Sequence, residues 1–216
     1  MQDIKIVGIY LAAGKSSRMG ENKLSLEAGD TTLGSFALKT ALKSQLSKVI
    51  VVTKKGDNLA WMDPILFCTS SQEKWYHVEC KESDKGQAHS LRCGVETARR
   101  FGAEGVMILL ADQPLVSLEF INKMISQYLK NRRLHYVAAS YQGIPRPPVL
   151  FSQIMFEALM KLQGDEGARG LLRRDTLMSG MLVEHDDPDC FFDIDTRQQY
   201  RQIKNLLGRG TKDVRR

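Results

Sequence analysis

The chain alternates between two hydrophobic patterns, and the first is a short, nearly continuous apolar run. Three such runs cover residues 4–11, 48–53 and 105–111. Unbroken apolar runs of this length predict strands that are buried on both faces, as in a parallel sheet. Residues 75–80 and 135–140 form less regular runs, which predict two further strands of the same sheet.

The second pattern places apolar residues three and four positions apart, which is the spacing of one helix face. It occurs between the strand-like runs, in residues 32–45, 86–101 and 118–129. An order of strand, helix, strand, helix predicts a mostly parallel sheet with helices on both faces, joined by right-handed crossovers. We therefore expect a single Rossmann-like α/β domain that binds its ligands at the carboxyl ends of the strands.

The pattern becomes less regular in the last third of the chain. The stretch "QGIPRPPVLF", residues 142–151, is rich in turn-forming residues and predicts a loop. Helical spacing returns in residues 153–162, 168–175 and 197–207, and short apolar stretches predict strands at 181–184 and 191–194. We expect residues 1–207 to form one domain, with residues 208–216 as a basic, disordered tail.

The formal net charge of +6 is confined to one end of the chain. Residues 197–216 carry seven lysines and arginines against one acidic residue, so the rest of the chain is formally neutral. An excess of positive charge at one end of the chain, without aromatic residues that could stack on bases, does not indicate a nucleic-acid surface. We therefore expect no nucleic-acid partner. No apolar run approaches the ~20 residues that span a bilayer, and no secretory signal pattern is visible. We therefore expect a cytoplasmic protein with no membrane partner.

The chain has four cysteines, Cys68, Cys80, Cys93 and Cys190. None of them forms a C-x-x-C pair or shows another spacing typical of a metal site. In a reducing cytoplasm we expect all four to be free thiols.

The stretch "LAAGKSSRMGENKL", residues 11–24, follows the first strand-like run and concentrates glycine and positive charge. Glycines allow close backbone approach and positive φ, and consecutive exposed N–H groups can form a nest for an anion. Lys15, Arg18 and Lys23 add positive charge, so the stretch suits a polyphosphate. The alternative is an ordinary polar loop after a strand. It is not a Walker A loop, because the G-x-x-x-x-G-K-[ST] pattern is absent.

The same stretch resembles the signature L-A-[AG]-G-x-[SG]-x-R-[MF]-G-x-x-K of nucleotidyltransferases that activate sugars and cofactors. Four further stretches support the resemblance: "GQAHSLRCG" (86–94), "LADQPL" (110–115), "GDEGAR" (164–169) and "DIDT" (193–196). Over residues 4–205 the chain is most similar to the molybdenum cofactor nucleotidyltransferases, in particular the molybdopterin cytidylyltransferases. The resemblance implies the nucleotide-diphospho-sugar transferase fold. It also implies transfer of CMP from CTP to molybdopterin or molybdenum cofactor, with release of pyrophosphate.

The resemblance implies that the loop wraps the triphosphate and that the helix after residue 86 faces the base and ribose. The implied nucleotide-binding residues are Leu11, Ala12, Ala13, Gly14, Lys15, Arg18, Lys23, Gly86, Gln87, Ala88 and Ser90. Arg18 and Lys23 are the implied catalytic residues, because nearby cations stabilise the charge that develops during phosphoryl transfer. Guanylyl enzymes of the family resemble L-A-G-G at the loop and cytidylyl enzymes resemble L-A-A-G, so Ala13 favours CTP over GTP.

Acidic residues at two places, taken together with the resemblance, predict a magnesium site. Asp112 directly follows the third apolar run, and Asp193 and Asp195 alternate along the last expected strand. Alternate strand residues share a face, and two carboxylates on one face repel each other unless a cation lies between them. We expect Mg²⁺ to bind Asp112 together with Asp193 or Asp195, and the sequence does not decide between these two. The alternatives are a turn-capping role for Asp112 and a helix-capping role for Asp195 or Thr196.

The acceptor side is implied by "RPPVLF" and "GDEGAR", with Pro148, Asp165 and Arg169 as the contacts. Without the resemblance these stretches indicate a turn followed by a helix. The full expectation is a Mg²⁺-dependent enzyme that matures a hydroxylase of the xanthine dehydrogenase type and contacts the apo-molybdoenzyme transiently. Two alternatives stay open: a nucleotidyltransferase acting on a sugar- or polyol-phosphate, and a non-catalytic accessory protein that binds the cofactor.

Overall fold

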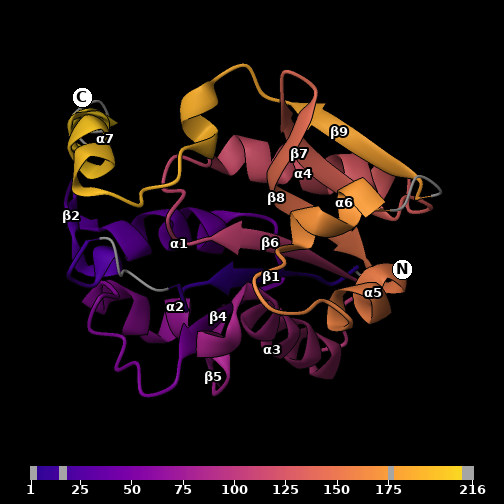
Figure 1. Ribbon diagram of the computed structural model, residues 1–216, viewed down its shortest axis with the longest axis horizontal. Helices are drawn as coiled ribbons and strands as arrows, with labels where there is room; N and C mark the ends of the chain where they lie inside the picture. Colours follow the sequence, from indigo (N-terminus) through magenta and orange to yellow (C-terminus); the bar gives the residue numbers. More distant parts are fainter. Residues whose placement is uncertain (1–3, 15–18, 175–177, 211–216) are drawn as a thin grey trace.

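The computed structural model describes residues 4–14, 19–174 and 178–210 of the chain. In this part, seven strands form one sheet in the order β5-β4-β1-β6-β8-β7-β9 (Figure 1). The strands are β1 (Ile6–Leu11), β4 (Lys48–Lys54), β5 (Trp75–Cys80), β6 (Gly105–Leu110), β7 (Tyr136–Tyr141), β8 (Ile144–Ser152) and β9 (Gly180–Glu184). Strands β5, β4, β1 and β6 run parallel, whereas β8 pairs antiparallel with both β6 and β7. The mostly parallel α/β domain predicted from the pattern is confirmed.

Helices cover both faces of the sheet because its central strands are apolar on both sides. The main helices are α1 (Leu33–Lys43), α3 (Gln87–Arg100), α4 (Leu118–Lys130) and α5 (Phe156–Met160). Ile6 of β1 packs in a core cluster with α1 and α4, whereas its neighbour Val7 packs in a second cluster with α3 and α5. Figure 1 shows α3 and α4 on opposite sides of β1 and β6. Each fully buried aliphatic side chain of this kind contributes about 1.5–3 kcal/mol to folding.

The proline-rich residues 142–151, predicted as a loop, instead form most of strand β8. The prediction was wrong because the turn residues and prolines belong to a hairpin formed by β7 and β8. The turn between β7 and β8 uses positive φ angles of 51° at Gln142 and 72° at Gly143. A register shift in β7 pairs Ala138 with Val149 but Ala139 with Arg146, so the two prolines between them lie in a bulge. Proline has no N–H to donate, and a bulge is a place where a strand tolerates it.

Shorter elements complete the fold. They are the strands β2 (Glu27–Ala28) and β3 (Thr31–Thr32), the helices α2 (Thr69–Gln72), α6 (Leu171–Arg174) and α7 (Arg197–Gly210), and the 3-10 helices η1 (Lys23–Ser25), η2 (Pro64–Phe67), η3 (Ser83–Lys85), η4 (Gln153–Met155), η5 (Ala168–Gly170) and η6 (Pro188–Phe191). Helix α7 lies beside β2, and its Ile203 packs in a small core cluster with Ala28 and Ile194 (Figure 1). It extends to Gly210, three residues into the expected tail, and residues 211–216 lie outside the described part.

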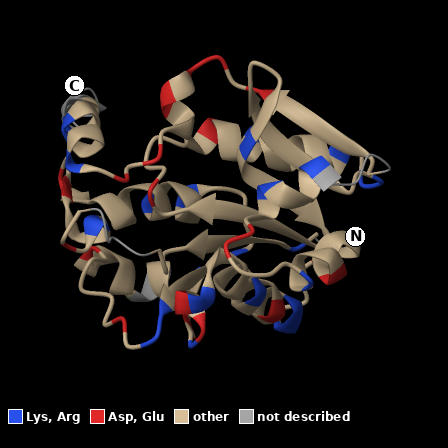
Figure 2. Cartoon of the chain, viewed as in Figure 1, with Lys and Arg blue, Asp and Glu red and all other residues tan. Residues whose placement is uncertain are grey.

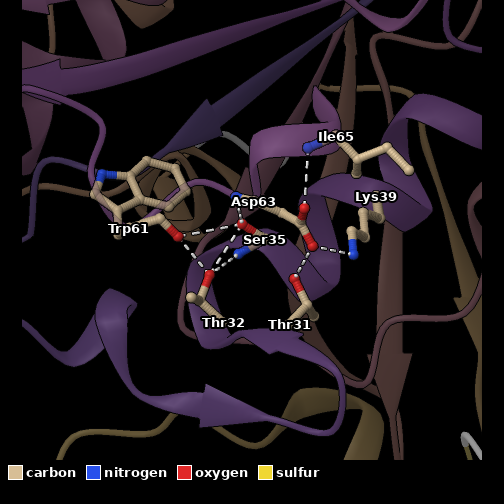
Figure 3. A network of polar contacts seen from close by, with 7 residues as sticks. All are labelled: Thr31, Thr32, Ser35, Lys39, Trp61, Asp63 and Ile65. Carbon is tan, nitrogen blue, oxygen red and sulfur yellow. Dashed lines mark hydrogen bonds and ion pairs between the residues drawn. The ribbon is translucent and has the colours of Figure 1, made fainter. Parts of the chain in front are cut away.

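A polar network fixes the N-terminus of α1 to the segment before η2 (Figure 3). Thr32 caps the helix by accepting a hydrogen bond from the Ser35 N–H, and its hydroxyl donates to the Trp61 carbonyl. Asp63 accepts hydrogen bonds from the Thr31 hydroxyl at 2.9 Å and from Lys39 Nζ at 2.5 Å. The bond from Lys39 lowers the pKa of Asp63, so the ionised carboxylate stabilises this corner of the fold.

Charged side chains lie on both sides of the sheet, and the cysteines match the expectation from the sequence. Figure 2 shows lysine, arginine, aspartate and glutamate positions on helices and loops on both sides of the sheet. The four cysteines are free thiols, as predicted. Within residues 4–14, 19–174 and 178–210, no helix combines the length and the apolar character needed to cross a bilayer.

Candidate active site

A groove follows the edge of the sheet where β1, β4 and β6 end, and three adjoining cavities form it. The glycine-loop cavity, about 500 Å³, is lined by residues that include Ala13, Gly14, Gly20, Asn22 and Lys54. The central cavity, about 290 Å³, includes Gly14, Gly86, Gln87, Ser90 and Asp112. The arginine cavity, about 330 Å³, includes Gln113, Arg146, Arg169, Arg173 and Phe191. Ala13, Gly14 and Ser83 line both of the first two cavities, and Gln87, Leu110 and Asp165 line both of the last two.

The residues that follow β1 line the first two cavities, where we expected the triphosphate. Ala12 continues the strand with a hydrogen bond from its N–H to the Val52 carbonyl at 2.8 Å, and the chain then turns into the groove. Leu11, Ala13 and Gly14 line the central cavity. The predicted residues Lys15 and Arg18 lie outside the described residues.

The start of α3 forms the opposite wall of the central cavity. Gly86 has a φ of 123°, and a Cβ atom there would lie 2.2 Å from the Gly164 carbonyl oxygen, so only glycine fits. Gln87 and Ser90, which we expect to contact a nucleotide, line the cavity. Ala88 has the same predicted role but does not line the cavity. Its side chain is fully buried in the core, and its N–H already donates to the Gly164 carbonyl at 3.0 Å.

A charged cluster lies beside the central cavity. Lys23, the first residue of η1, is 6% exposed, and its Nζ contacts Asp112 Oδ2 at 2.7 Å and Asp195 Oδ1 at 2.9 Å. Burial acts to lower the pKa of Lys23, but its two carboxylate partners outweigh burial, and the pKa is raised. Lys23 is therefore held as a cation at the point where the sequence predicted a metal.

Asp112 and the "DIDT" segment are joined through the backbone. The Ile194 N–H donates to the Asp112 carbonyl at 3.0 Å, and the fully buried Ile194 side chain anchors the segment in the core. This contact brings Asp195 to Lys23, although 172 positions separate the two residues in the sequence.

The strand predicted at 191–194 is not present, and this changes the roles of its two acids. The segment leaves η6 as irregular backbone, so Asp193 and Asp195 do not share a strand face. Asp193 accepts a hydrogen bond from Gln113 Nε2 at 2.9 Å and lines the arginine cavity. Burial, followed by the nearby charge of Asp112, raises the pKa of Asp193. Asp195, not Asp193, is the partner of Lys23.

The helix-capping alternative applies to Thr196. Its hydroxyl accepts a hydrogen bond from the Gln199 N–H at 3.2 Å, and Gln199 Oε1 accepts from the Asp195 N–H at 2.9 Å. This arrangement differs from a standard capping box because Gln199 accepts from the residue before the cap, and the Asp195 carboxylate contacts Lys23.

The cluster fits a divalent cation. Two carboxylate oxygens from separate segments already surround one cationic centre, which is the ligand type that Mg²⁺ and Mn²⁺ prefer. Among the described residues, no three acidic, histidine or cysteine side chains gather as a metal site. A cation held by Asp112 and Asp195 would therefore take its other ligands from phosphate oxygens and water, as Mg²⁺ does in nucleotide sites.

Two of the three residues predicted on the acceptor side, Asp165 and Arg169, line the arginine cavity. Pro148 is buried in the bulge of β8, and its neighbour Pro147 lines the cavity instead. Sequence reasoning missed Gln113 and Arg146. Both could have been found from their neighbours in the sequence, since Gln113 follows Asp112 and Arg146 precedes the two prolines.

Comparison with known proteins agrees with this geometry. The sequence model of the MobA-like NTP transferase domain matches residues 8–179. The purine catabolism protein PucB of Bacillus subtilis (strain 168) is 37% identical over 208 residues, covering 96% of this chain and 100% of PucB. The structure of Rv0371c from Mycobacterium tuberculosis H37Rv superposes with a TM-score of 0.72 at 24% identity, over 93% of this chain and 98% of Rv0371c. A nucleotidyl transferase from Methanothermobacter (Mth528) gives a TM-score of 0.75 at 20% identity, over 95% of this chain and 99% of that chain. The chain therefore belongs to the MobA-like NTP transferase family.

Proposed function

We propose that this protein transfers CMP from CTP to the phosphate group of molybdopterin or molybdenum cofactor. The family is one of nucleotidyl transfer, and the choice of nucleotide and acceptor is the proposal. The observation that carries it is the position of Asp112 and its partners Lys23 and Asp195. They lie beside the central cavity, which adjoins the glycine-loop cavity on one side and the arginine cavity on the other. A charged centre between two cavities suits a transfer between two bound substrates.

In the proposed reaction a phosphate oxygen of the acceptor attacks the α-phosphorus of CTP. The new P–O bond forms as the bond between the α-phosphorus and the bridging oxygen breaks, and pyrophosphate leaves with that electron pair. Lys23 and Arg18 stabilise the charge that develops on the phosphate oxygens. A divalent cation held by Asp112 and Asp195 would supply further positive charge at the same oxygens.

Two observations support the choice of substrates, and a third supports a divalent cation. Ala13, the position that favours CTP over GTP in the family resemblance, lines both nucleotide-side cavities. The related protein PucB is named for purine catabolism, and hydroxylases of the xanthine dehydrogenase type oxidise purines with a molybdenum cofactor. Rv0371c, which shares the fold, has also been solved in complex with manganese, and this supports a divalent cation.

The proposal is tested by measuring pyrophosphate release from each of the four NTPs, with MgCl₂, in the presence and absence of molybdopterin. We expect release only with CTP and molybdopterin together. With α-labelled CTP, the label should appear in a pterin dinucleotide. Sugar phosphates and polyol phosphates are supplied in parallel reactions. Label that enters only a nucleotide sugar or a nucleotide polyol would exclude the pterin acceptor.

Substitutions of Asp112 distinguish a catalytic role from the role of an accessory protein that only binds the cofactor. Asp112→Asn should lower the rate of pyrophosphate release by roughly 10²–10³, the usual cost of losing one electrostatic contact to the transition state. Asp187→Asn is the matched control, because Asp187 caps η6 through its side chain and asparagine can do the same. A wild type without detectable pyrophosphate release, combined with an Asp112→Ala variant that still matures the hydroxylase, would favour the accessory role.

A further inference from the structure

Strand β5 forms one edge of the sheet, and its outer side is unpaired (Figure 1). The Val49 N–H of β4 donates to the Lys74 carbonyl, just before β5, at 2.9 Å. Backbone groups point to alternate sides along a strand, so the even-numbered residues of β5 direct their N–H and C=O groups to β4. Among the described residues, the outward backbone groups have no hydrogen-bond partner. They belong to Trp75, His77 and Glu79.

β5 also lacks the features that usually protect an edge strand. Proteins blunt such edges with lysine, proline or a bulge, because an open edge pairs readily with another strand. β5 contains neither lysine nor proline, and its register with β4 is unbroken. Its single charged residue, Glu79, accepts a hydrogen bond from the Gly56 N–H at 3.0 Å, which draws the carboxylate towards the end of β4. The edge is therefore open to a partner strand.

Exposed apolar side chains lie on both faces of this edge. Tyr76 is 48% exposed, and its ring meets that of Phe101 edge to face, with 5.2 Å between the centroids. Trp75 points to the other face, where Phe67 of η2 contacts it at 5.6 Å and is itself 42% exposed. Large apolar side chains gathered at an unpaired strand are typical of a protein–protein interface.

A second copy of the chain fits this edge in a defined register. A twofold axis perpendicular to the sheet pairs two copies of β5 antiparallel. The outward groups of the two strands must meet, so odd-numbered residues oppose odd-numbered residues. When His77 opposes His77 of the second copy, Trp75 of each copy opposes Glu79 of the other. In this register every outward backbone group of β5 gains a partner.

The charges that flank β5 favour the same register. Glu73 precedes the strand and Lys81 follows it, both are exposed, and neither forms an ion pair among the described residues. Each lies four positions from His77, so the register centred there brings Glu73 of each copy to Lys81 of the other. A shift of two residues would instead oppose Glu73 to Glu79, and like charges directly opposite each other are destabilising.

We infer that β5 is a self-association edge, at which two copies of this chain form a symmetric dimer centred on His77. Tyr76 of each copy then packs against Val78 of the other, an aromatic and β-branched pair that stabilises antiparallel strands. The two sheets become continuous. Their strands run in opposite directions, so the two grooves face opposite ways. The inference is independent of the proposed function. A single edge strand of six residues makes a small interface, so we expect a Kd in the micromolar range.

The first test is sedimentation velocity of the full chain from about 1 to about 200 µM, over which the wild type should pass from monomer to dimer. Lys81→Glu and Glu73→Lys should each raise the dimer Kd about tenfold or more, because two attractive pairs become repulsive. The double variant that carries both substitutions should regain the dimer, since the charges are exchanged. Lys123→Glu is the matched control. It makes the same change in net charge at an exposed position of α4 and should leave the Kd unchanged.

The second test maps the register by crosslinking. In a Cys68→Ser background, which removes the exposed thiol, His77→Cys should give a disulfide-linked dimer under mild oxidation. Glu79→Cys should not, because the two copies of this residue would lie about 13 Å apart along the strands. Thermal unfolding identifies a variant that fails to fold. If His77→Cys fails, the exchange of charges between Glu73 and Lys81 decides the matter.

Three results would overturn the inference. The first is a wild type that remains monomeric at about 200 µM, where a micromolar Kd requires a dimer. The second is a dimer whose Kd neither charge reversal changes, since its contact would lie elsewhere on the surface. The third is a crosslink through Glu79→Cys in the absence of one through His77→Cys.

Discussion

A divalent cation that binds Asp112 and Asp195, as proposed, would compete with Lys23 for the same two carboxylates, and the substitution Lys23→Met tests this competition. Methionine keeps the length and the apolar stem of the side chain but removes the ammonium group. In the wild type that group contacts Asp112 at 2.7 Å and Asp195 at 2.9 Å. The variant therefore removes the ammonium group that links the two carboxylates.

The magnitude follows from burial. The Lys23 side chain is 7% exposed, the Asp112 side chain 26% and the Asp195 side chain 42%. A hydrogen bond to a charged group contributes about 1.5–3 kcal/mol, and the half-exposed Asp195 contact belongs well below that range because water screens it. We expect Lys23→Met to lower the free energy of unfolding by about 2–3 kcal/mol without metal. For a chain of this size, Tm should fall by roughly 4–12 °C.

Divalent metal should reverse part of this loss. MnCl₂ or MgCl₂ should raise the Tm of Lys23→Met more than that of the wild type, because no ammonium group has to be displaced from the carboxylates. The rate of the proposed CMP transfer should nevertheless fall by roughly 10²–10³, since the ammonium group of Lys23, the proposed catalytic cation, is gone. Tm is measured by circular dichroism against metal concentration, and the rate by pyrophosphate release.

Lys39→Met is the matched control. It removes another partly buried ion pair, with Asp63 at 2.5 Å, outside the groove. This variant should lose stability without any metal-dependent recovery. An equal metal response in Lys23→Met and the wild type would refute the idea that lysine and metal occupy one site.

Contacts elsewhere in the fold predict three further outcomes. Asp63→Asn should destabilise the protein at pH 7, because Lys39 lowers the pKa of Asp63. In urea denaturation the difference from the wild type should shrink as pH falls below about 4, where this contribution is lost. Gly86→Ala should lower Tm, because its Cβ would lie 2.2 Å from a carbonyl oxygen, whereas a Cβ at Gly170 meets nothing within 4 Å, and Gly170→Ala should match the wild type. A thiol reagent should label the exposed Cys68 before the three buried or half-buried thiols, and equal rates would contradict the described packing.

The sequence predicted the parallel half of the sheet well, because burial on both faces leaves a strong local signal. Each central strand is an apolar run, and its end places the next polar residue at the groove, as with Asp112 after β6. The antiparallel half carried no such signal. Strand β8 contains three prolines, and only its pairing with β7 and β6 makes it a strand. A bulge that absorbs two of these prolines depends on the partner strand, so local pattern could not reveal it.

The site was predictable in composition but not in its pairings. The acids and the lysine were identified, yet the sequence could not tell that Asp195 meets Lys23 while Asp193 turns to Gln113. The deciding feature is the burial of Ile194, which orients the two acids differently on irregular backbone. Strand periodicity would have placed both acids on one face. Contacts between residues far apart in the sequence depend on the assembled core, which a local pattern does not encode.

The charges of the cluster also constrain the order of binding. Among the described residues, the carboxylates of Asp112, Asp193 and Asp195 lie near the ammonium group of Lys23. Each carboxylate repels the phosphates of an approaching triphosphate at short range. A divalent cation held by Asp112 and Asp195 would reduce that repulsion. The affinities for CTP and for the cation should therefore be coupled, and each ligand should raise the affinity of the other by the same factor.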